Sequence, residues 1–385
     1  MIFKKIVLSS RHKPDYIFLG VTLFLIIAGF FFLSSASSDL AKIKYNDALF
    51  FVKNQFFKGF LPGLVGFIFA YFIYYRYLKK ISPFLFAANL LALFLVFTPL
   101  GFKSHGSARW IDLGFISFQP SEFLKITFIL YLAGLLSSNQ LRDLKKSWKV
   151  YWIFFFVSAV VGGLIFLQPA TTTAVIILSA GAIIYLFSGA SWKQITLTFL
   201  LGLTAIALLA LITPYRLYRI APYWNILAEK FFPSLILKDN IEKVDKFHLE
   251  QALSSISAGG LKGVGFGKST SKYSVLPEPM GDSIFAVIAE EFGFIGSLAV
   301  ISSYMIIFWR GTKLMKKTHD DFAKLCLLGF LSVISLQAII HIGANSGVLP
   351  FTGVPLPLIS YGGTSFAVTL TMIGIIANIS RYSST

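Results

Sequence analysis

The 385-residue sequence has one cysteine and few charged residues. Because Cys326 is alone, the chain cannot form an intramolecular disulfide. Charged residues make up 13% of the chain and hydrophobic residues 56%, which excludes both an ordinary soluble domain and a disordered chain. Acids are scarcest, with 17 Asp and Glu against 34 Lys and Arg. Each carboxylate within an apolar segment is therefore a candidate for a specific role.

Long apolar runs fill most of the chain, and the mean hydropathy is +0.75. Their lengths match the roughly 17 to 25 residues of a transmembrane helix. The runs also lack the alternation of apolar and polar residues that is typical of a membrane β-barrel. We predict an all-α integral membrane protein, a single polytopic domain over residues 1–385 with about ten transmembrane helices. The predicted spans are residues 16–33, 58–75, 82–98, 119–137, 150–168, 171–188, 193–213, 282–309, 322–343 and 357–379.

The basic residues predict the orientation of these spans. The first span resembles a signal peptide, but the many spans after it favour an uncleaved helix. The loops predicted on the same side of the membrane as the N-terminus hold Arg76, Lys79, Lys80, Arg142, Lys145, Lys146, Lys149, Lys193, Arg310, Lys313, Lys316 and Lys317. The opposite short loops hold only Lys42, Lys44, Lys53, Lys103 and Arg109. The positive-inside rule then places both termini in the cytoplasm and explains the net charge of +17 without a nucleic-acid partner.

Residues 214–281 form one large extracytoplasmic loop before the eighth span. Apolar residues near helical spacing over 241–256 predict an amphipathic helix on the membrane surface. A glycine-rich stretch follows at 259–269, but it is no phosphate-binding P-loop, because Lys262 stands where that motif needs glycine. Two interpretations remain: a flexible turn, or a loop whose Lys262, Lys268 and Lys272 hold a lipid diphosphate.

Polar side chains within the spans are the next candidates. In the fourth span Glu122 and Lys125 share a helix face, either as a neutralising pair or with Lys125 contacting substrate. Arg109, just upstream, is either an interface anchor or a diphosphate ligand. Gln337, His341 and Asn345 recur every four residues in the ninth span, as interhelical hydrogen-bonding groups or as proton or substrate handlers.

Two further segments mark the edges of a site. Residues 350–364, which include Ser360, are rich in Pro and Gly, and such broken backbone at membrane depth indicates that the tenth helix borders a wet cavity. Asp282 opens the eighth span as an N-cap, a cation ligand or a catalytic base. Glu290 and Glu291 lie two turns further along and are better interpreted as partners of neighbouring helices.

The chain resembles the SEDS family of polytopic cell-wall polymerases, whose members include FtsW and RodA. The resemblance lies in Ala108 to Ile111, Phe118 to Glu122, Gly259 to Gly267, Leu276 to Gly296 and Gly347 to Gly363. The run from Lys272 to Glu278 is more similar to FtsW than to RodA. This resemblance implies a peptidoglycan glycosyltransferase of the bacterial cytoplasmic membrane that polymerises lipid II at the outer face, together with a class B penicillin-binding protein and divisome or elongasome membrane proteins.

The family's essential acid falls on Asp282, and its fourth-span acid and base fall on Glu122 and Lys125. We therefore expect Asp282 as general base, Lys125 and Arg109 as diphosphate ligands, with Lys268 as a further substrate contact, and Glu122 as the group that orients Lys125. Gln337, His341, Asn345 and Ser360 are expected to line the cavity. A divalent cation, Mg or Mn, bridging Asp282 and the diphosphate is compatible with the sequence, although no ligand cluster demands one.

Two departures from the family pattern qualify these expectations. Ala170 stands where the family usually has an acid, and Gly281 replaces the usual Thr before Asp282. A second carboxylate near the site is therefore not expected. Two rival functions remain open: a transporter that flips lipid II across the bilayer, and a scaffold that activates a partner transpeptidase without catalysing a reaction.

Overall fold

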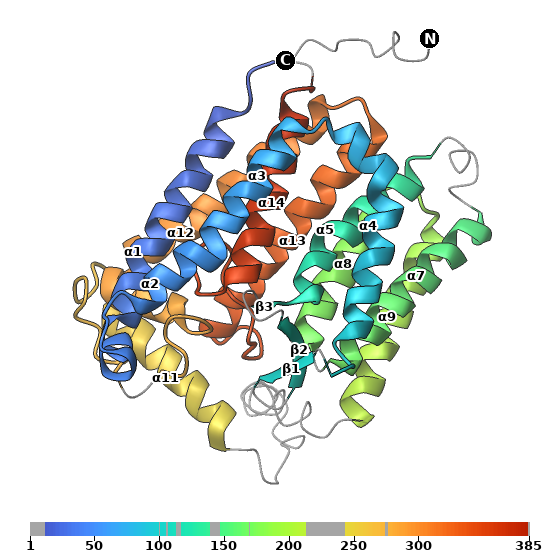
Figure 1. Cartoon of the computed structure of the whole chain (residues 1–385). Helices are drawn as coiled ribbons and strands as arrows, with labels where there is room; N and C mark the ends of the chain where they lie inside the picture. The colour runs from blue at the N-terminus through green and yellow to red at the C-terminus, as the bar shows by residue number, and fades with distance from the viewer. Residues whose placement is uncertain are drawn as a thin grey trace.

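The computed structural model describes residues 12–99, 101–104, 107–112, 117–138, 147–168, 170–212, 243–273 and 276–383. Over these residues the predicted all-helical membrane architecture is confirmed, and every predicted span overlaps a helix (Figure 1). The helices are α1 Tyr16–Tyr45, α2 Phe50–Gln55, α3 Leu61–Phe72, α4 Tyr75–Leu95, α5 Pro120–Leu136, α7 Trp148–Leu167, α8 Thr171–Phe187, α9 Trp192–Ile212, α11 Lys243–Gly259, α12 Ile284–Lys317, α13 Asp321–Asn345 and α14 Gly363–Ser380. Within the described ranges, seven helical segments are long and apolar enough to cross a membrane.

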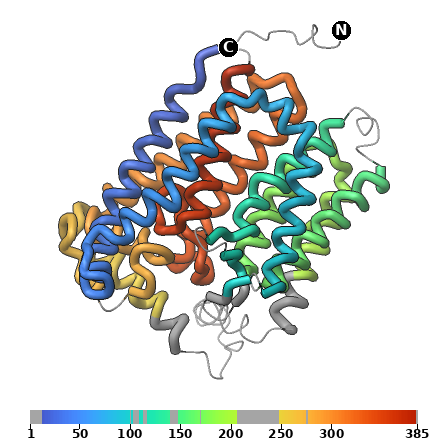
Figure 2. The backbone as a smooth tube through the Cα atoms, in the orientation of Figure 1, coloured from blue at the N-terminus to red at the C-terminus, as the bar shows by residue number. Residues whose placement is uncertain are grey.

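The second span is one rod made of three pieces: α2, a π-helical turn at Phe56–Phe60, and α3 (Figure 2). This rod packs along α14. The approach is close because Gly63 faces Ala367, where an added Cβ would lie 2.9 Å from the Cα of Ala367. Small residues let membrane helices approach in this way, since van der Waals packing replaces the hydrophobic effect as the driving force in lipid. The rod therefore fixes α14 and the segment that precedes it.

A small sheet lies between α4 and α5, and the sequence did not predict it. Strands β1 Gly101–Ser104, β2 Ser107–Asp112 and β3 Ser117–Phe118 form an antiparallel sheet in the order β1-β2-β3. Ile111 of β2 pairs with Gly101 of β1 and with Phe118 of β3. The sheet leads directly into α5 and positions Arg109 on β2.

The first and last described residues lie at one end of the bundle, which we call the terminal end (Figure 1). There the amide of His12 donates to the carbonyl of Arg381 over 2.9 Å, and Arg310 forms an ion pair of 2.7 Å with Asp15. Arg76, one of the residues predicted on the cytoplasmic side, also lies here. Arg142, Lys145 and Lys146 lie outside the described residues. Two ends on one side agree with the predicted even number of spans, and the cytoplasmic location of this end stays a prediction.

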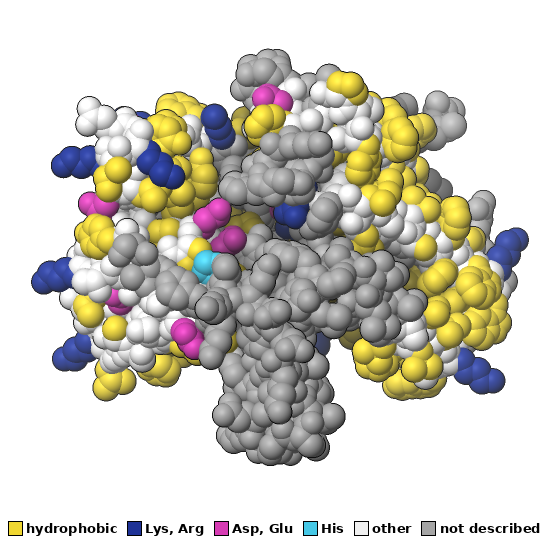
Figure 3. Space-filling model, turned by 90° about the horizontal axis from the view of Figure 1, so that it is seen from below, with side chains coloured by type: hydrophobic (Ala, Val, Ile, Leu, Met, Phe, Trp, Pro, Cys, Tyr) yellow, Lys and Arg dark blue, Asp and Glu magenta, His cyan; other side chains and the backbone are white. Residues whose placement is uncertain are grey.

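The opposite end, which we call the site end, carries the sheet and α11. The predicted amphipathic helix is confirmed as α11, which buries Leu249 and Ala252 against the bundle. Ala252 packs with Ala36 of α1 and with Ala286 and Val287 of α12. Residues 214–242, 274 and 275 of the predicted loop lie outside the described residues. Seen from this end, acidic side chains and a histidine lie left of the centre, and apolar side chains gather at the right edge (Figure 3).

Candidate functional site

Lys125 and Glu122 form a buried ion pair in the first turns of α5. Pro120 occupies the first helical turn, where its missing N–H costs nothing, and the i, i+3 spacing then brings the two side chains together. The Lys125 ammonium lies 2.8 Å from both carboxylate oxygens of Glu122, and the two residues are only 1% and 5% exposed. A third bond of 2.8 Å reaches the side-chain oxygen of Gln337 on α13. The contact between Glu122 and Lys125 that their spacing predicted is confirmed, and a role for Lys125 in binding substrate stays a prediction.

The predicted polar stripe of α13 joins this ion pair to the site end. The Gln337 amide donates to the carbonyl of Pro355 over 2.8 Å, and Nδ1 of His341 lies 2.7 Å from the carbonyl of Val354. One turn further, the Asn345 amide donates to the main-chain carbonyl of Asp282 over 2.9 Å. All three side chains are 1% exposed or less. Buried amides and imidazoles pay a large desolvation cost unless bonded, so these contacts fix the stripe against its neighbours.

The irregular backbone expected before the tenth helix is present, and α14 begins at Gly363, later than the predicted 357. Ser360 holds this segment: its hydroxyl donates to the carbonyl of Gly281 and accepts from the amide of Leu356, both over 2.8 Å. The amide of Tyr361 donates to the carbonyl of Met280 over 2.8 Å. The segment is therefore bonded on one side to α13 and on the other to the turn that carries Asp282. That Ser360 and the α13 stripe line a wet cavity stays a prediction.

Asp282 stands at the centre of these contacts, although the interpretation of it as an N-cap was wrong. α12 begins at Ile284 and its N-cap is Ser283, whose hydroxyl donates to the carbonyl of Pro277 instead of capping the helix. Asp282 precedes the cap by one residue and is half-buried. Its carboxylate faces Gly353, where an added Cβ would lie 3.1 Å from Oδ2. A side chain at position 353 would press against this carboxylate.

Lys125 and Asp282 mark two separate levels of the site. Lys125 bonds to Glu122 and Gln337, and not to Asp282. Because Gln337 and Asn345 lie eight residues apart on one helix, the two charged groups are attached about 12 Å apart along α13. Lys125 is thus connected to Asp282 through α13 and not by direct contact.

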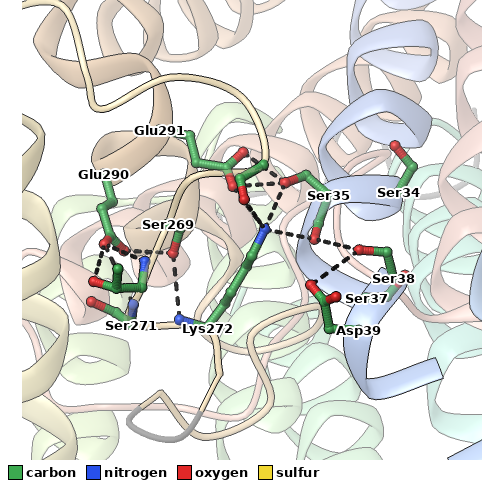
Figure 4. Close-up of polar contacts among 12 residues, drawn as sticks. Ser34, Ser35, Ser37, Ser38, Asp39, Ser269, Ser271, Lys272, Glu290 and Glu291 are labelled. Atoms are coloured by element: carbon green, nitrogen blue, oxygen red, sulfur yellow. Dashed lines mark hydrogen bonds and ion pairs between the residues drawn. The ribbon is translucent and has the colours of Figure 1, made fainter. Parts of the chain in front are cut away.

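The other predicted substrate contacts lie at the edge of the site. Arg109 donates from Nε to the carbonyl of Gln168 over 3.0 Å, at the α7–α8 turn where Ala170 replaces the family acid. Lys268 is exposed on the glycine-rich stretch. Lys272 is unavailable to an anion, because its ammonium lies in a buried ion pair of 3.2 Å with Glu291 (Figure 4). Arg109 therefore lies beside the turn that leads into α8.

Three buried polar atoms around Asp282 have no hydrogen-bond partner among the described residues: Nε2 of His341, Oδ1 of Asn345 and Oγ1 of Thr352. Such atoms are costly unless a bound water or ligand group satisfies them. They belong to α13, which bonds to the main chain of Asp282, and to the residue before Gly353, which faces the Asp282 carboxylate. Within the described ranges no group of three His, Cys, Asp or Glu side chains is placed to hold a metal, so a cation here would take its remaining ligands from a substrate diphosphate.

The chain matches one known protein family over nearly its whole length. The family described as "Cell cycle protein", named for FtsW, RodA and SpoVE, matches residues 15–385. The chain belongs to the FtsW/RodA/SpoVE family. The resemblance to SEDS proteins that the motifs indicated is therefore confirmed.

Individual members of the FtsW/RodA/SpoVE family match over most of their length. Stage V sporulation protein E of Bacillus subtilis is 31% identical over 379 residues, covering 97% of this chain and 99% of that protein. A "Probable peptidoglycan glycosyltransferase FtsW" of Coxiella burnetii is 35% identical over 306 residues, 78% of each chain. The RodA crystal structure from Thermus thermophilus is 26% identical, with a TM-score of 0.70 over 97% of this chain and 98% of that one.

A second solved structure belongs to a complex. Its title is "Structural coordination of polymerization and crosslinking by a peptidoglycan synthase complex", and the chain matches it with a TM-score of 0.75 and 25% identity over 96% of this chain and 98% of that one. The fold of the FtsW/RodA/SpoVE family therefore holds across the described bundle.

Proposed function

We propose that the chain is a peptidoglycan glycosyltransferase that polymerises lipid II at the outer face of the bacterial cytoplasmic membrane. Relatives named as probable peptidoglycan glycosyltransferases support the reaction class. The observation that carries the proposal is the placement of Asp282. Its carbonyl is bonded to Asn345 and its carboxylate faces Gly353. Asn345 and Thr352, next to Gly353, each carry a buried polar atom without a hydrogen-bond partner among the described residues, at the end of the bundle where we place the lipid-linked sugar.

In this mechanism Asp282 takes the proton from the 4-hydroxyl of one lipid II sugar as its oxygen attacks the anomeric carbon of another. The bond from that carbon to the diphosphate oxygen breaks with its electron pair, and undecaprenyl diphosphate leaves. Lys125, oriented by Glu122, and Arg109 supply positive charge to the leaving diphosphate. Since Lys125 is attached about 12 Å from Asp282 along α13, the site is long enough for base and leaving-group contacts to act on different parts of the substrate.

The partners that we propose are lipid II and a class B penicillin-binding protein, within the divisome or the elongasome. A solved relative whose title names a peptidoglycan synthase complex supports a partner enzyme. Matches to FtsW and to a sporulation protein keep septal growth and sporulation open as settings. We place the site end outside the cell and both termini in the cytoplasm, supported by Arg76 and Arg310 at the terminal end.

The test follows labelled lipid II into glycan chains with the purified protein, alone and with its transpeptidase partner. We expect polymerisation by the unsubstituted protein and none by Asp282→Asn, with unchanged thermal unfolding and partner binding. Asp47→Asn is the matched control, because Asp47 lies in an exposed ion pair with Lys53 and should retain full activity. Normal polymerisation by Asp282→Asn would refute the assignment of the base.

The rival functions predict different results in the same assay. A flippase would move lipid II across vesicle membranes without producing glycan, and Lys125 variants would affect it more than Asp282 variants. A scaffold would bind and activate its partner equally well with Asn at position 282. Absence of glycan from every preparation would favour these rivals.

A further inference from the structure

The α12 helix is broken at Gly293, where φ is 65° and ψ is −159°. The break leaves main-chain amides and carbonyls of α12 without partners in the helix. Main-chain groups of the glycine-rich stretch bond to them instead. The carbonyls of Glu290 and Glu291 accept from the amides of Val264 and Gly265, both over 3.0 Å. Residues 259–273, which we call the glycine loop, therefore lie against the broken helix main chain to main chain.

Bonds in the other direction complete the pairing. The amides of Phe294 and Ile295 donate to the carbonyls of Gly260 and Leu261 over 2.9 and 3.3 Å. Glycine is required because of the close approach: a Cβ on Gly293 would lie 2.4 Å from the amide nitrogen of Gly263. The glycines thus serve backbone pairing, which argues against the expected flexible turn and against a loop whose amides bind diphosphate.

Two helices give the depth of this pairing. Gly293 lies nine residues beyond Ile284, so the break is about 14 Å along α12 from its start at the site end. Phe266 of the loop stacks on Phe31 of α1 with ring centroids 4.2 Å apart, and Phe31 lies about 22 Å along α1 from Tyr16 at the terminal end. With a hydrocarbon core about 30 Å thick that begins near Tyr16, the distance along α1 places Phe266 within the core, in the half nearer the site end.

The outer surface of the glycine loop is apolar. Leu261 is 73% exposed and Phe266 is 45% exposed. They continue the exposed apolar surface of α12, where Phe294 and Ile295 are 59% and 62% exposed. Irregular backbone does not face lipid unless its polar groups are satisfied, and the pairing with α12 meets that condition for the amides that it engages.

Beneath this surface the loop covers charged groups (Figure 4). Glu291 pairs with Lys272 and accepts from the hydroxyl of Ser35 on α1, and Glu290 accepts from the hydroxyl of Ser269 over 2.6 Å. Ser269 and Lys272 belong to the glycine loop, and Glu290 and Glu291 belong to the turn of α12 before Gly293. Charges at this depth are stable only when paired and shielded from acyl chains.

We infer that the glycine loop is a re-entrant membrane segment whose exposed apolar side chains contact the acyl chains of bilayer lipids. The partner is lipid because the surface is continuous with the lipid-facing side of α12. Exposed Lys262 and Lys268 carry flexible stems that reach headgroup phosphates from this depth. The inference is independent of the proposed reaction.

The test measures membrane depth with a nitroxide label on the purified full chain in phosphatidylethanolamine and phosphatidylglycerol vesicles. Leu261→Cys is compared with Ile295→Cys on the exposed face of α12 and with His319→Cys in the exposed turn between α12 and α13. The native Cys326 is fully buried, so unsubstituted protein reports background labelling. Collisions with oxygen, which partitions into lipid, are measured against collisions with a water-soluble nickel chelate.

We expect the oxygen-to-nickel collision ratio at position 261 to equal the ratio at position 295 and to exceed the ratio at position 319. A ratio equal to that at His319 would overturn the inference, because the loop would then lie in water. Low collision rates with both reagents would also overturn it, since another protein surface, such as a second copy of the chain, would then cover Leu261. Leu261 is largely exposed, so the cysteine variant removes few contacts, and its thermal unfolding is checked in parallel.

Discussion

The side-chain amide of Asn345 donates to the main-chain carbonyl of Asp282 over 2.9 Å, and the same nitrogen donates to the carbonyl of His341 over 2.9 Å. Asp282 is thereby tied to the backbone of α13. Eight residues earlier, Gln337 bonds to the Lys125 ammonium. One helix thus sets the positions of two charged groups that belong to different elements, which makes Asn345 and Gln337 positioning residues for the proposed reaction.

Replacing Asn345 with Ala should slow polymerisation while the protein still folds. The change removes both donated bonds, so the carbonyl of Asp282 loses its partner at a cost of about 1–3 kcal/mol. A displacement of the base that raises the barrier by about 1.4 kcal/mol lowers the rate about tenfold. Initial rates measured over a range of lipid II concentrations should show a fall in kcat with little change in KM.

Ser346→Ala is the matched control for this prediction. Ser346 is next to Asn345, but its hydroxyl donates only to carbonyls within α13, those of Ile342 and Gly343. Its loss should leave the polymerisation rate unchanged. Equal loss of activity in both variants would contradict a specific role for Asn345 and point to a general disturbance at the end of α13.

Substitutions in the buried ion pair of α5 test whether Glu122 and Lys125 serve stability alone or also the proposed reaction. Lys125→Met leaves Glu122 charged and without its cation, which should lower the free energy of unfolding by about 3–5 kcal/mol. The double variant Glu122→Gln, Lys125→Met has no unpaired charge and should recover part of that loss. Thermal unfolding in detergent measures both effects.

For these two variants the polymerisation rate should not follow the unfolding temperature. If Lys125 contacts the diphosphate, the double variant remains inactive although its unfolding temperature recovers, because the positive charge is still absent. Polymerisation by the double variant at the rate of the unsubstituted protein would instead show that Glu122 and Lys125 form only a neutralising structural pair.

Periodicity and composition were enough to predict the helical scaffold. Apolar runs gave the spans because a helix needs a fixed length to cross the bilayer. Apolar spacing gave α11, and the i, i+3 rule gave the contact between Glu122 and Lys125. These features depend on local spacing, which the sequence displays directly. The family motifs then selected Asp282 among the few acids.

Features that depend on tertiary contact were missed. A glycine within an apolar run is compatible with a continuous helix, so nothing local marked Gly293 as a break. Strands β1 and β3, with four and two residues, are too short to show alternation. Ser283 serves as N-cap in place of Asp282 because the turn before it bonds to Ser360 and Asn345, residues more than sixty positions away. The level of Lys125 relative to Asp282 likewise follows from α13, which touches both.

The break in α12 predicts that Gly293 is intolerant of any side chain. Gly293→Ala places a Cβ at a φ of 65° and within 2.6 Å of the main chain of Leu261 and Gly263, so the glycine loop must move away. Strain of about 1–3 kcal/mol, with loss of the paired main-chain bonds, should lower the unfolding temperature. Gly163→Ala is the control, because nothing lies within 4 Å of its added Cβ in α7, and replacing a helical glycine there should stabilise by about 0.5–1 kcal/mol. Equal unfolding temperatures for the two variants would mean that α12 does not need its break.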